Sequence, residues 1–555
     1  MHADILIVGG GTGGTAAALA AAGRDLTVIM TEETDWIGGQ LTAQCVPPDE
    51  HPWIEQLGCT ARYRSYRDRV REHYEPGNRR LNPGGGWVSR LCHEPRVGVA
   101  VLEAMMPSEV TILRRHKPIS ATVEGDRVTS VTLWNLDDDS EITITARFVL
   151  DATESGELLP LTGTEYRLGA ESKAETGEQN AVDGPAEPDN IQGLTWCFAM
   201  CWNPGGASNL IEKPRDYEKW RAVKPDFWPG PLLGFQVLNA HTGEPNELPL
   251  FRDDGVPYAL FTYRQITPFP NELREVIQET KGNEFRDIVL ELWAEEPWAN
   301  RAVTIVNWPQ NDYFAASILD VDPPGSRSRL PGASGLVSEA RLLDAKQLSL
   351  SLLYWLQTEA PRHDGGVGYP ELALAPDITD TEDGFAKYPY LREGRRIEAM
   401  FTVKEQDVSF ADNQEAGKAR ELPQSVGIGA YRIDLHPSTN GRNMIDTSTY
   451  PFQIPLGALV PVRMKNLIPA ARNIGVTHIT NGCYRLHPVE WNIGEVAGLL
   501  ATFCLERGGV QPWELLTTDT FPNPHPQTAE LLFADFAALL EREGIERSWP
   551  QFRAL

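Results

Sequence analysis

The sequence predicts an α/β fold in which a Rossmann-like sheet is built from two distant parts of the chain, with a mixed α+β domain inserted between them. Two observations predict the sheet: a strand, glycine cluster, helix and strand at 4–33, and a second strand-then-helix pattern at 459–508. The insertion is predicted because aromatic residues and prolines become dense between about 166 and 454, where the apolar runs are short. A chain of 555 residues is also too long for one core.

The N-terminal pattern is typical of a segment that grips a dinucleotide. A short apolar run precedes GGGTGG at 9–14, and an alanine-rich stretch then leads to a second strand and to Glu32. In such a motif Gly9 permits the tight turn, Gly11 lets the backbone approach a pyrophosphate, and Gly14 lets the helix pack on the strand. The phosphates lie on unpaired N–H groups at the helix start, and a carboxylate about 20 residues later binds a ribose hydroxyl.

The remaining elements are predicted in chain order. We expect helices at 62–71 and 94–106, three strand-like runs from 110, 127 and 141 that form a β-meander, a helix at 340–358, a helix that starts near Trp491, and a helix at 528–543. The third run of the meander ends in Asp151, Ala152 and Thr153. These elements predict a discontinuous dinucleotide-binding domain (1–165 and 455–515), a substrate or cap domain (166–454) and a helical tail (516–555).

Composition and charge exclude several classes of protein. A formal net charge of −27 disfavours a nucleic-acid partner, because phosphate backbones require a basic surface. We expect no membrane span, since no apolar run approaches the ~20 residues that one requires, and no signal peptide. Seven cysteines without framework spacing fit a cytoplasmic protein. Cys197 and Cys201 have no companion ligands, so we expect no metal site.

Four segments together resemble the glutathione-reductase-like FAD superfamily: GGGTGG with Glu32, GGQ at 38–40, the strand that ends in Asp151, and NLIPAARN at 466–473 with the helix after it. More narrowly, FVLDATESGELLPLTGTEYRLGAES, YPYLREGRRIEA, IDLHP and RLHPVEWNIGEVAG resemble the FAD-dependent oxidoreductase family, which is distantly related to fumarate reductase and succinate dehydrogenase flavoproteins. The resemblance implies FAD as the cofactor but no particular reaction.

The resemblance also implies which residues contact FAD. The glycine cluster and Glu32 would hold the ADP half, and the helix near Trp491 would direct its N-terminus at the flavin pyrimidine ring. Many relatives carry an acidic residue for the ribityl chain where Arg472 and Asn473 stand here. The full set of expected contacts is Gly9, Gly11, Thr12, Gly13, Gly14, Glu32, Gly38, Gly39, Gln40, Asp151, Ala152, Thr153, Arg472, Asn473, Trp491, Asn492 and Ile493.

Two groups of residues are candidates for chemistry. His487 and Glu490 fall in the predicted loop before the flavin-facing helix, so we predict His487 as general base and Glu490 as the residue that orients it or binds substrate. The alternative for this pair is a structural cap of the helix. Arg392, Arg395 and Arg396 predict a clamp for a carboxylate or for sugar hydroxyls, or else a buried structural pair. His436 is predicted to line the same pocket.

Together these features predict an FAD-dependent oxidoreductase that dehydrogenates a small polar substrate by hydride transfer to flavin N5. An alcohol, a sugar-like compound or an amine fits, with oxygen or a carrier as electron acceptor. Arg485 is a further candidate for contact with flavin or substrate. The alternatives are a flavin-dependent hydratase or isomerase without net redox chemistry, and a non-catalytic flavin-binding protein. A homo-oligomer also stays open.

Overall fold

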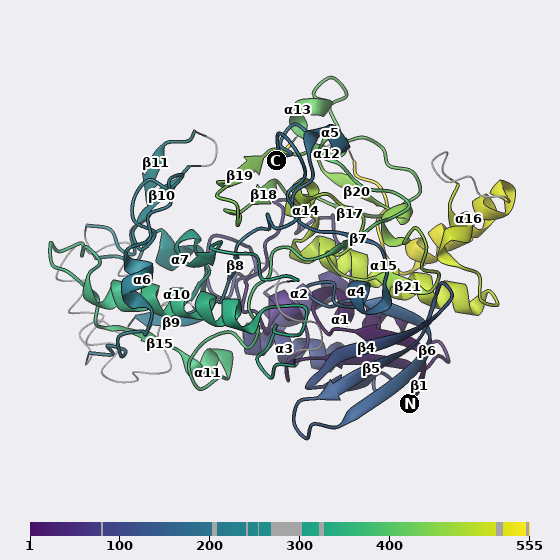
Figure 1. Ribbon diagram of the computed structural model, residues 1–555, viewed down its shortest axis with the longest axis horizontal. Coiled ribbons are helices and arrows are strands. Elements are labelled where there is room, and N and C mark those ends of the chain that lie inside the picture. Colours follow the sequence, from purple (N-terminus) through teal and green to yellow (C-terminus); the bar gives the residue numbers. More distant parts are fainter. Residues whose placement is uncertain are drawn as a thin grey trace.

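The computed structural model describes residues 1–78, 81–202, 208–239, 242–253, 255–267, 302–320, 327–517, 525–550 and 554–555. Its frame is a seven-stranded sheet with the strand order β3-β2-β1-β6-β5-β4, and β21 pairs with β6 outside this path (Figure 1). The strands are β1 (His2–Val8), β2 (Val28–Glu32), β3 (Thr111–Arg114), β4 (His116–Glu124), β5 (Arg127–Asn135), β6 (Glu141–Asp151) and β21 (Leu467–Pro469). The predicted α/β fold with a Rossmann-like sheet is confirmed.

The first strand lies at the centre of this sheet and is parallel to both neighbours, β2 and β6. Its side chains alternate between two cores: Ile5 and Ile7 pack toward the helices, whereas Leu6 and Val8 pack toward the meander. The returning segment joins the same sheet, because Leu467 of β21 pairs in parallel with Val149 of β6. Residues from the two ends of the sequence therefore share one sheet, as the repeated strand-then-helix pattern predicts.

The β-meander differs from the predicted one. The run from 110 forms β3, which pairs in parallel with β2 instead of entering the meander. A left-handed residue, Arg115 with φ of 62°, ends this strand, and the chain continues directly into β4, which was not predicted. The meander therefore consists of β4, β5 and β6 in antiparallel order. The alternation of β4 is irregular at Pro118, which hides its strand pattern in the sequence.

Two helices from opposite ends of the chain pack closely on this sheet, α1 (Thr12–Ala21) and α15 (His487–Glu506) (Figure 1). A Cβ atom added at Gly494 would lie 2.0 Å from the carbonyl oxygen of Gly13, and one added at Gly498 would lie 2.4 Å from that of Ala17. Small residues thus let the two helix backbones touch, which places the start of α15 beside the glycine cluster.

The start of α15 corrects the predicted boundary. The helix begins at His487 with Leu486 as N-cap, not near Trp491, because Pro488 favours the first turn and Glu490 provides a first-turn carboxylate. His487 and Glu490 therefore belong to the helix and not to a preceding loop. Other predicted helices are present as α2 (Ala61–Tyr74), α3 (Pro95–Met105), α10 (Glu339–Thr358) and α16 (Pro526–Arg542).

The part of the inserted region from Ile191 to Leu391, drawn mostly in teal at the end of the molecule away from the sheet, has its own aromatic core, whereas residues from Val403 to Ile454 join the core around α15 (Figure 1). An antiparallel sheet of order β12-β13-β9-β15 packs near α10, with strands β9 (Phe198–Trp202), β12 (Gln265–Thr267), β13 (Val303–Val306) and β15 (Leu372–Leu374). The domain boundaries at 165, 455 and 515 stay predictions, and part of the proposed tail, 518–524 and 551–553, lies outside the described residues.

The other elements are short. They are α4 (Leu158–Thr162), α5 (Lys173–Thr176), α6 (Tyr217–Arg221), α7 (Leu260–Tyr263), α11 (Pro376–Thr379), α12 (Glu405–Val408), α13 (Phe410–Asn413), α14 (His478–Tyr484), β7 (Tyr166–Arg167), β8 (Leu194–Thr195), β10 (Gln236–Leu238), β11 (Pro245–Glu247), β14 (Asp312–Tyr313), β16 (Arg396–Ile397), β17 (Ser425–Gly429), β18 (Ile433–Leu435), β19 (Ile445–Thr447) and β20 (Phe452–Pro455). Within the described ranges, no helix has both the length and the apolar character that crossing a membrane requires.

Candidate functional site

A narrow cavity of about 40 Å³ opens where β1, β2 and β6 end, at the start of α1. Parallel strands end at the same edge of a sheet, which is where such folds bind their ligands. Residues of three predicted segments, which are far apart in the sequence, meet at this edge. The predicted contacts that line this cavity are Gly9, Gly11, Glu32, Gly39, Ala152 and Thr153.

The glycine cluster is required by close backbone approach. Gly9 has φ of 102°, and a Cβ atom there would lie 2.3 Å from the carbonyl oxygen of Ala152. A Cβ atom at Gly13 would lie 1.9 Å from the carbonyl oxygen of Ala470, and one at Gly14 would lie 1.9 Å from that of Gly9. Side chains are thus excluded where α1 begins, which leaves a cradle of the kind that admits a pyrophosphate.

Glu32 is the last residue of β2, and its carboxylate closes one side of the cradle. The Gly10 N–H donates to Oε2 over 3.0 Å, while the Thr34 N–H and hydroxyl donate to Oε1 over 2.7 and 2.8 Å. Burial raises the pKa of Glu32 to about 8. A buried carboxylate at this position is the group that the dinucleotide motif uses to accept from a ribose hydroxyl.

A second carboxylate, Glu154, lies against the same glycines and was not predicted. Its Oε1 lies 2.5 Å from where a Cβ atom of Gly11 would stand. Arg472 forms a buried ion pair with Glu154 and a second one, of 3.2 Å, with Glu490. A pyrophosphate in the cradle would compete with Glu154 for this guanidinium. Arg472 thus stands between the predicted phosphate end and the start of α15.

The start of α15 carries buried polar groups that the described residues do not satisfy. Gln40 Nε2 donates to Glu490 Oε2 over 2.8 Å and to the carbonyl oxygen of Arg485 over 3.0 Å. Gln40 Oε1, Glu490 Oε1 and His487 Nε2 are buried and have no hydrogen-bond partner among the described residues. Burial raises the pKa of Glu490. Unsatisfied buried donors and acceptors are costly, and this mixed set fits the polar edge of a flavin ring.

The hydrogen bond that His487 makes bears on its predicted role. The Asp49 N–H donates to His487 Nδ1 over 2.9 Å, so Nδ1 acts as acceptor and the proton of the neutral ring belongs on Nε2. Burial lowers the pKa of His487 well below its usual range. In this state Nε2 is a donor. The geometry thus favours His487 as a hydrogen-bond donor, whereas its role as general base stays a prediction.

Other predicted FAD contacts either support the backbone around the cradle or lie in the protein core away from it. Asp151 accepts from the Thr153 hydroxyl over 2.7 Å, and Asn473 donates to the Asp151 carbonyl oxygen over 3.1 Å. Trp491 stacks on Tyr66 at a centroid distance of 5.9 Å. The remaining ones are buried: Asn492 accepts from the Ile428 N–H, Thr12 donates to the Gly38 carbonyl oxygen, and Ile493 lies in the core.

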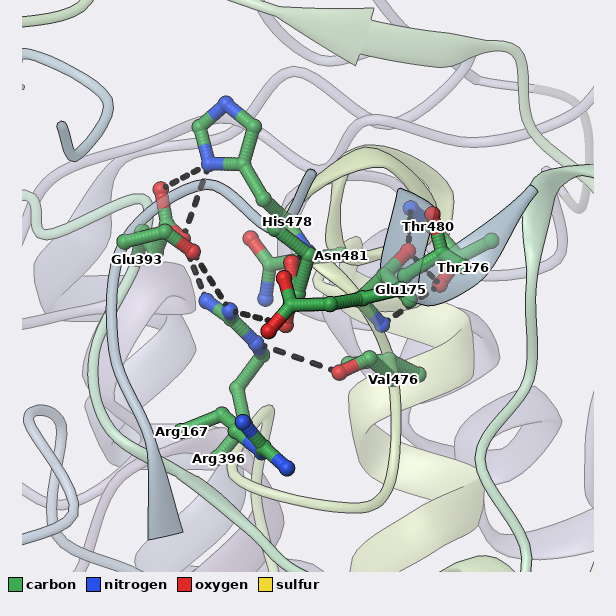
Figure 2. A network of polar contacts seen from close by, with 12 residues as sticks. Arg167, Glu175, Thr176, Glu393, Arg396, Val476, His478, Thr480 and Asn481 are labelled. Atoms are coloured by element: carbon green, nitrogen blue, oxygen red, sulfur yellow. Dashed lines mark hydrogen bonds and ion pairs between the residues drawn. The ribbon is translucent and has the colours of Figure 1, made fainter. Parts of the chain in front are cut away.

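The three arginines predicted as a clamp are held in ion pairs, and Arg395 pairs with Asp320 over 2.7 Å. Figure 2 shows Arg396 pointing at Glu393, which also bonds His478 Nδ1 over 2.9 Å. Burial alone would raise the pKa of Glu393. The neighbouring His478 and Arg396 outweigh that effect and lower the pKa to about 2. Arg392 pairs with Asp312 over 3.0 Å. These contacts match the alternative of buried structural pairs.

His436 shares Asp312 with Arg392, because its Nδ1 lies 2.5 Å from the second oxygen of that carboxylate. His436 also lines a larger cavity of about 410 Å³, as does Arg485. Arg392 and Arg396 are absent from the described lining, although Arg392 donates to Asn307, which is part of it. The lining comprises Asp49, Trp87, Leu248, Tyr258, Ala259, Leu260, Tyr263, Arg264, Asn307, Trp308, Pro309, Tyr390, Tyr431, Asp434, His436, Met444 and Arg485.

Sequence reasoning missed Asp49, Glu154 and Arg264. Asp49 follows two prolines in a loop, and Arg264 follows a short helix in the inserted region, so neither belongs to a motif with fixed spacing. Glu154 directly follows the predicted Asp151–Thr153 contacts, and that proximity was the only available signal. The described residues contain no group of three or more His, Cys, Asp or Glu side chains that could hold a metal ion.

Comparison with known proteins agrees with this geometry. The model of one protein family, FAD dependent oxidoreductase, matches residues 4–518. The chain belongs to this family. The predicted cofactor, FAD, and the predicted class of FAD-dependent oxidoreductase are thereby confirmed at the level of the family. The wider relation to fumarate reductase flavoproteins and to the glutathione-reductase-like superfamily stays a prediction. A search of curated proteins found no match.

Solved structures match parts of the chain. An L-proline dehydrogenase from P. horikoshii is 19% identical over 30% of this chain and 24% of its own, with a TM-score of 0.18. A myxobacterial FAD-dependent chondrochloren halogenase is 17% identical over 38% and 45%, with a TM-score of 0.18. A bacillithiol disulfide reductase from Bacillus cereus is 15% identical over 28% and 41%, with a TM-score of 0.19. The chain thus spans less than half the length of these proteins.

Proposed function

We propose that this chain dehydrogenates a small polar substrate in the 410 Å³ cavity beside the first turn of α15. One observation supports the proposal: a single helix start serves both sites. Glu490 accepts from Gln40 on the side of the predicted FAD contacts, while His487 accepts from the backbone of Asp49, which lines the cavity. A substrate in this cavity would therefore lie next to the flavin end of the cofactor.

Bound FAD supplies a hydride acceptor at N5 of its flavin ring. The dipole of α15 places positive partial charge at its start, on the same side. His487 Nε2–H, which lies outside the described lining of the cavity, would donate to the polar edge of the flavin ring and so help to hold the ring beside the substrate. Burial raises the pKa of Asp49, so its carboxylate would be the cavity group that takes the substrate proton.

Anaerobic bleaching tests this proposal. Protein loaded with FAD should absorb at about 450 nm, and addition of its substrate without oxygen should abolish that absorbance. Panels of alcohols, sugars, amines and carboxylates would be mixed with the loaded protein. Bleaching by one class is the expected result. Conversion of a compound without bleaching would instead favour the hydratase or isomerase, and protein that cannot be loaded with FAD would contradict the proposal.

A further inference from the structure

We infer that the substrate of the 410 Å³ cavity is a carboxylate on an aromatic or similarly planar apolar body, and that Arg264 binds its carboxylate group. This inference rests on the proposed function, because it names the class of compound that the same cavity takes. The geometry of two arginines and the aromatic lining of the cavity carry it. Neither Arg264 nor the aromatic residues are part of the predicted FAD contacts.

Arg264 is a buried arginine with an unused donor. It is 7% exposed and lines the cavity, with its Nε donating to the Asn307 carbonyl oxygen over 3.1 Å. Its Nη1 has no hydrogen-bond partner among the described residues. The nearest carboxylate oxygen, Asp49 Oδ1, lies 3.8 Å from Nη1, which is too long for a hydrogen bond. A buried guanidinium with a free donor is costly unless an acceptor arrives.

A second arginine lies on the same wall. Arg485 Nη1 donates to the Tyr390 hydroxyl over 2.7 Å, and Nη2 donates to the Asp434 carbonyl oxygen over 3.0 Å. Its Nε is buried and has no partner within the described part of the chain. Each of these two guanidinium groups keeps one nitrogen without a partner, and a carboxylate offers two oxygens that can accept from two such donors.

The acidic residues of the cavity do not cancel this preference. Asp434 is engaged by Arg485, with a distance of 3.3 Å between Oδ2 and Nη2. Asp49 forms only a long ion pair with Arg264, with 3.8 Å between Oδ1 and Nη1. His436 is engaged by Asp312. Arg264 therefore keeps an N–H donor that no acid accepts by a hydrogen bond, whereas Arg485 is already paired with Asp434.

Aromatic side chains indicate the body of the ligand. Trp308 and Tyr390 are buried members of the lining, while Trp87, Tyr258 and Tyr263 are exposed members of it. The rings of Trp87 and Tyr258 meet edge to face with 6.0 Å between centroids. Aromatic walls favour flat apolar groups that stack or meet them at an edge. A volume of about 410 Å³ is within the range of small-molecule sites.

Calorimetric binding to FAD-loaded protein tests this inference with three probes that share one ring system. These are 2-naphthoate, the matching alcohol 2-naphthalenemethanol and the matching amine 2-naphthylmethylamine. We expect 2-naphthoate to bind at least about tenfold more tightly than either of the others, since only a carboxylate uses both guanidinium groups. Equal or tighter binding of the amine or the alcohol would overturn the inference.

Arg264→Met should weaken 2-naphthoate binding by about tenfold or more, and Arg264→Lys should weaken it less, because it keeps the charge but loses the fork. Arg362→Met is the matched control: Arg362 lies over the ring of Tyr369 at 4.7 Å, much as Arg264 lies over that of Tyr263 at 5.2 Å, but it is outside the described lining. Undiminished affinity in Arg264→Lys and Arg264→Met would overturn the inference. If Arg264→Met does not fold, Arg264→Lys against Arg362→Met decides.

Failure of the inference and failure of the proposed function give different results. Protein that binds 2-naphthoate through Arg264, but whose flavin no compound bleaches, would keep the carboxylate site and contradict the dehydrogenase. Protein whose flavin is bleached by neutral or cationic substrates, without preference for 2-naphthoate, would keep the dehydrogenase and contradict the carboxylate site.

Discussion

At the nucleotide end of the molecule, the cradle is made by backbone and by residues close together in the sequence, whereas the large cavity is made by side chains from many distant loops. Gly9 and Gly11 belong to one turn, and their neighbours come from the ends of adjacent strands. The cavity instead combines residues from Asp49 to Arg485. Ligand binding in the cradle depends on glycines that have no side chain. Ligand binding in the cavity depends on side chains whose polar atoms have no partner.

The largest effect is expected at the glycine cradle. Gly13→Ala puts a Cβ atom 1.9 Å from the Ala470 carbonyl oxygen, so α1 must move away from Ala470. We expect FAD binding to be lost and the FAD-free protein to be destabilised by about 3 kcal/mol. Thermal unfolding and flavin absorbance measure the two effects.

Gly234→Ala is the matched control, because its Cβ atom would lie no closer than 3.1 Å to its nearest neighbour, the Pro231 carbonyl oxygen. It should cost less than about 1 kcal/mol and leave FAD binding intact. Similar losses in both variants would show that the cradle does not differ from an ordinary loop.

The next largest effect is expected at His487, at the start of α15, between the nucleotide cradle and the large cavity. His487→Ala should slow flavin reduction by about 100-fold. His487→Gln keeps an N–H donor near the position of Nε2, so it should stay within about tenfold of the parent if His487 donates. Stopped-flow absorbance under anaerobic conditions measures both rates. Equal losses in the two variants would instead support the general-base role.

Because of Glu32, the affinity for FAD should rise about tenfold from pH 6 to pH 8. Its pKa of about 8 means that the carboxyl is protonated in the FAD-free protein below that pH. A ribose hydroxyl that donates to the carboxylate favours the ionised form, so FAD binding releases a proton and tightens as pH rises. The same raised pKa should make FAD-free protein lose stability as pH rises toward 8, because burial disfavours the ionised form.

Titration of FAD-free protein with FAD at several pH values measures this dependence. Glu32→Gln cannot ionise and should flatten it. A dependence that survives in Glu32→Gln would assign the proton to another group and remove Glu32 from the ribose contact.

The smallest effect is expected at Glu154. Glu154→Gln removes the negative charge beside Gly11 and frees Arg472, so FAD should bind about threefold more tightly. Glu165→Gln is the control, since Glu165 is partly exposed and pairs with Arg463 at 2.6 Å. Fluorescence quenching of FAD during titration measures the affinities. Weaker binding in Glu154→Gln would mean that the carboxylate supports the cradle instead of competing with phosphate.

The same contrast explains what the sequence predicts. The glycine spacing, Glu32 and the returning segment at 459–508 predict the sheet and one cavity, because turn geometry and strand ends have local signatures. Arg264 and Asp49 have no such signature. Tertiary folding brings both into the lining of the cavity, and only the structure shows that Arg264 Nη1 has no hydrogen-bond partner among the described residues. The three arginines of YLREGRRIEA suggest a clamp because their buried partners cannot be read from the sequence: Arg396 pairs with Glu393 and Arg392 with Asp312, and the clamp stays a prediction. The meander strand β4 was missed because Pro118 interrupts its alternation.

The contact between Gly13 of α1 and Gly494 of α15 has a consequence for how the protein is made. A ribosome releases α1 long before α15, so the wall that supports the cradle does not exist while most of the chain is being synthesised. Long-range contacts of this kind form slowly and leave strand edges and helix faces exposed meanwhile. Flavin capture is therefore a late event in biogenesis, and a nascent chain stalled before α15 emerges would be a substrate for chaperones and proteases instead of a precursor that already holds its cofactor.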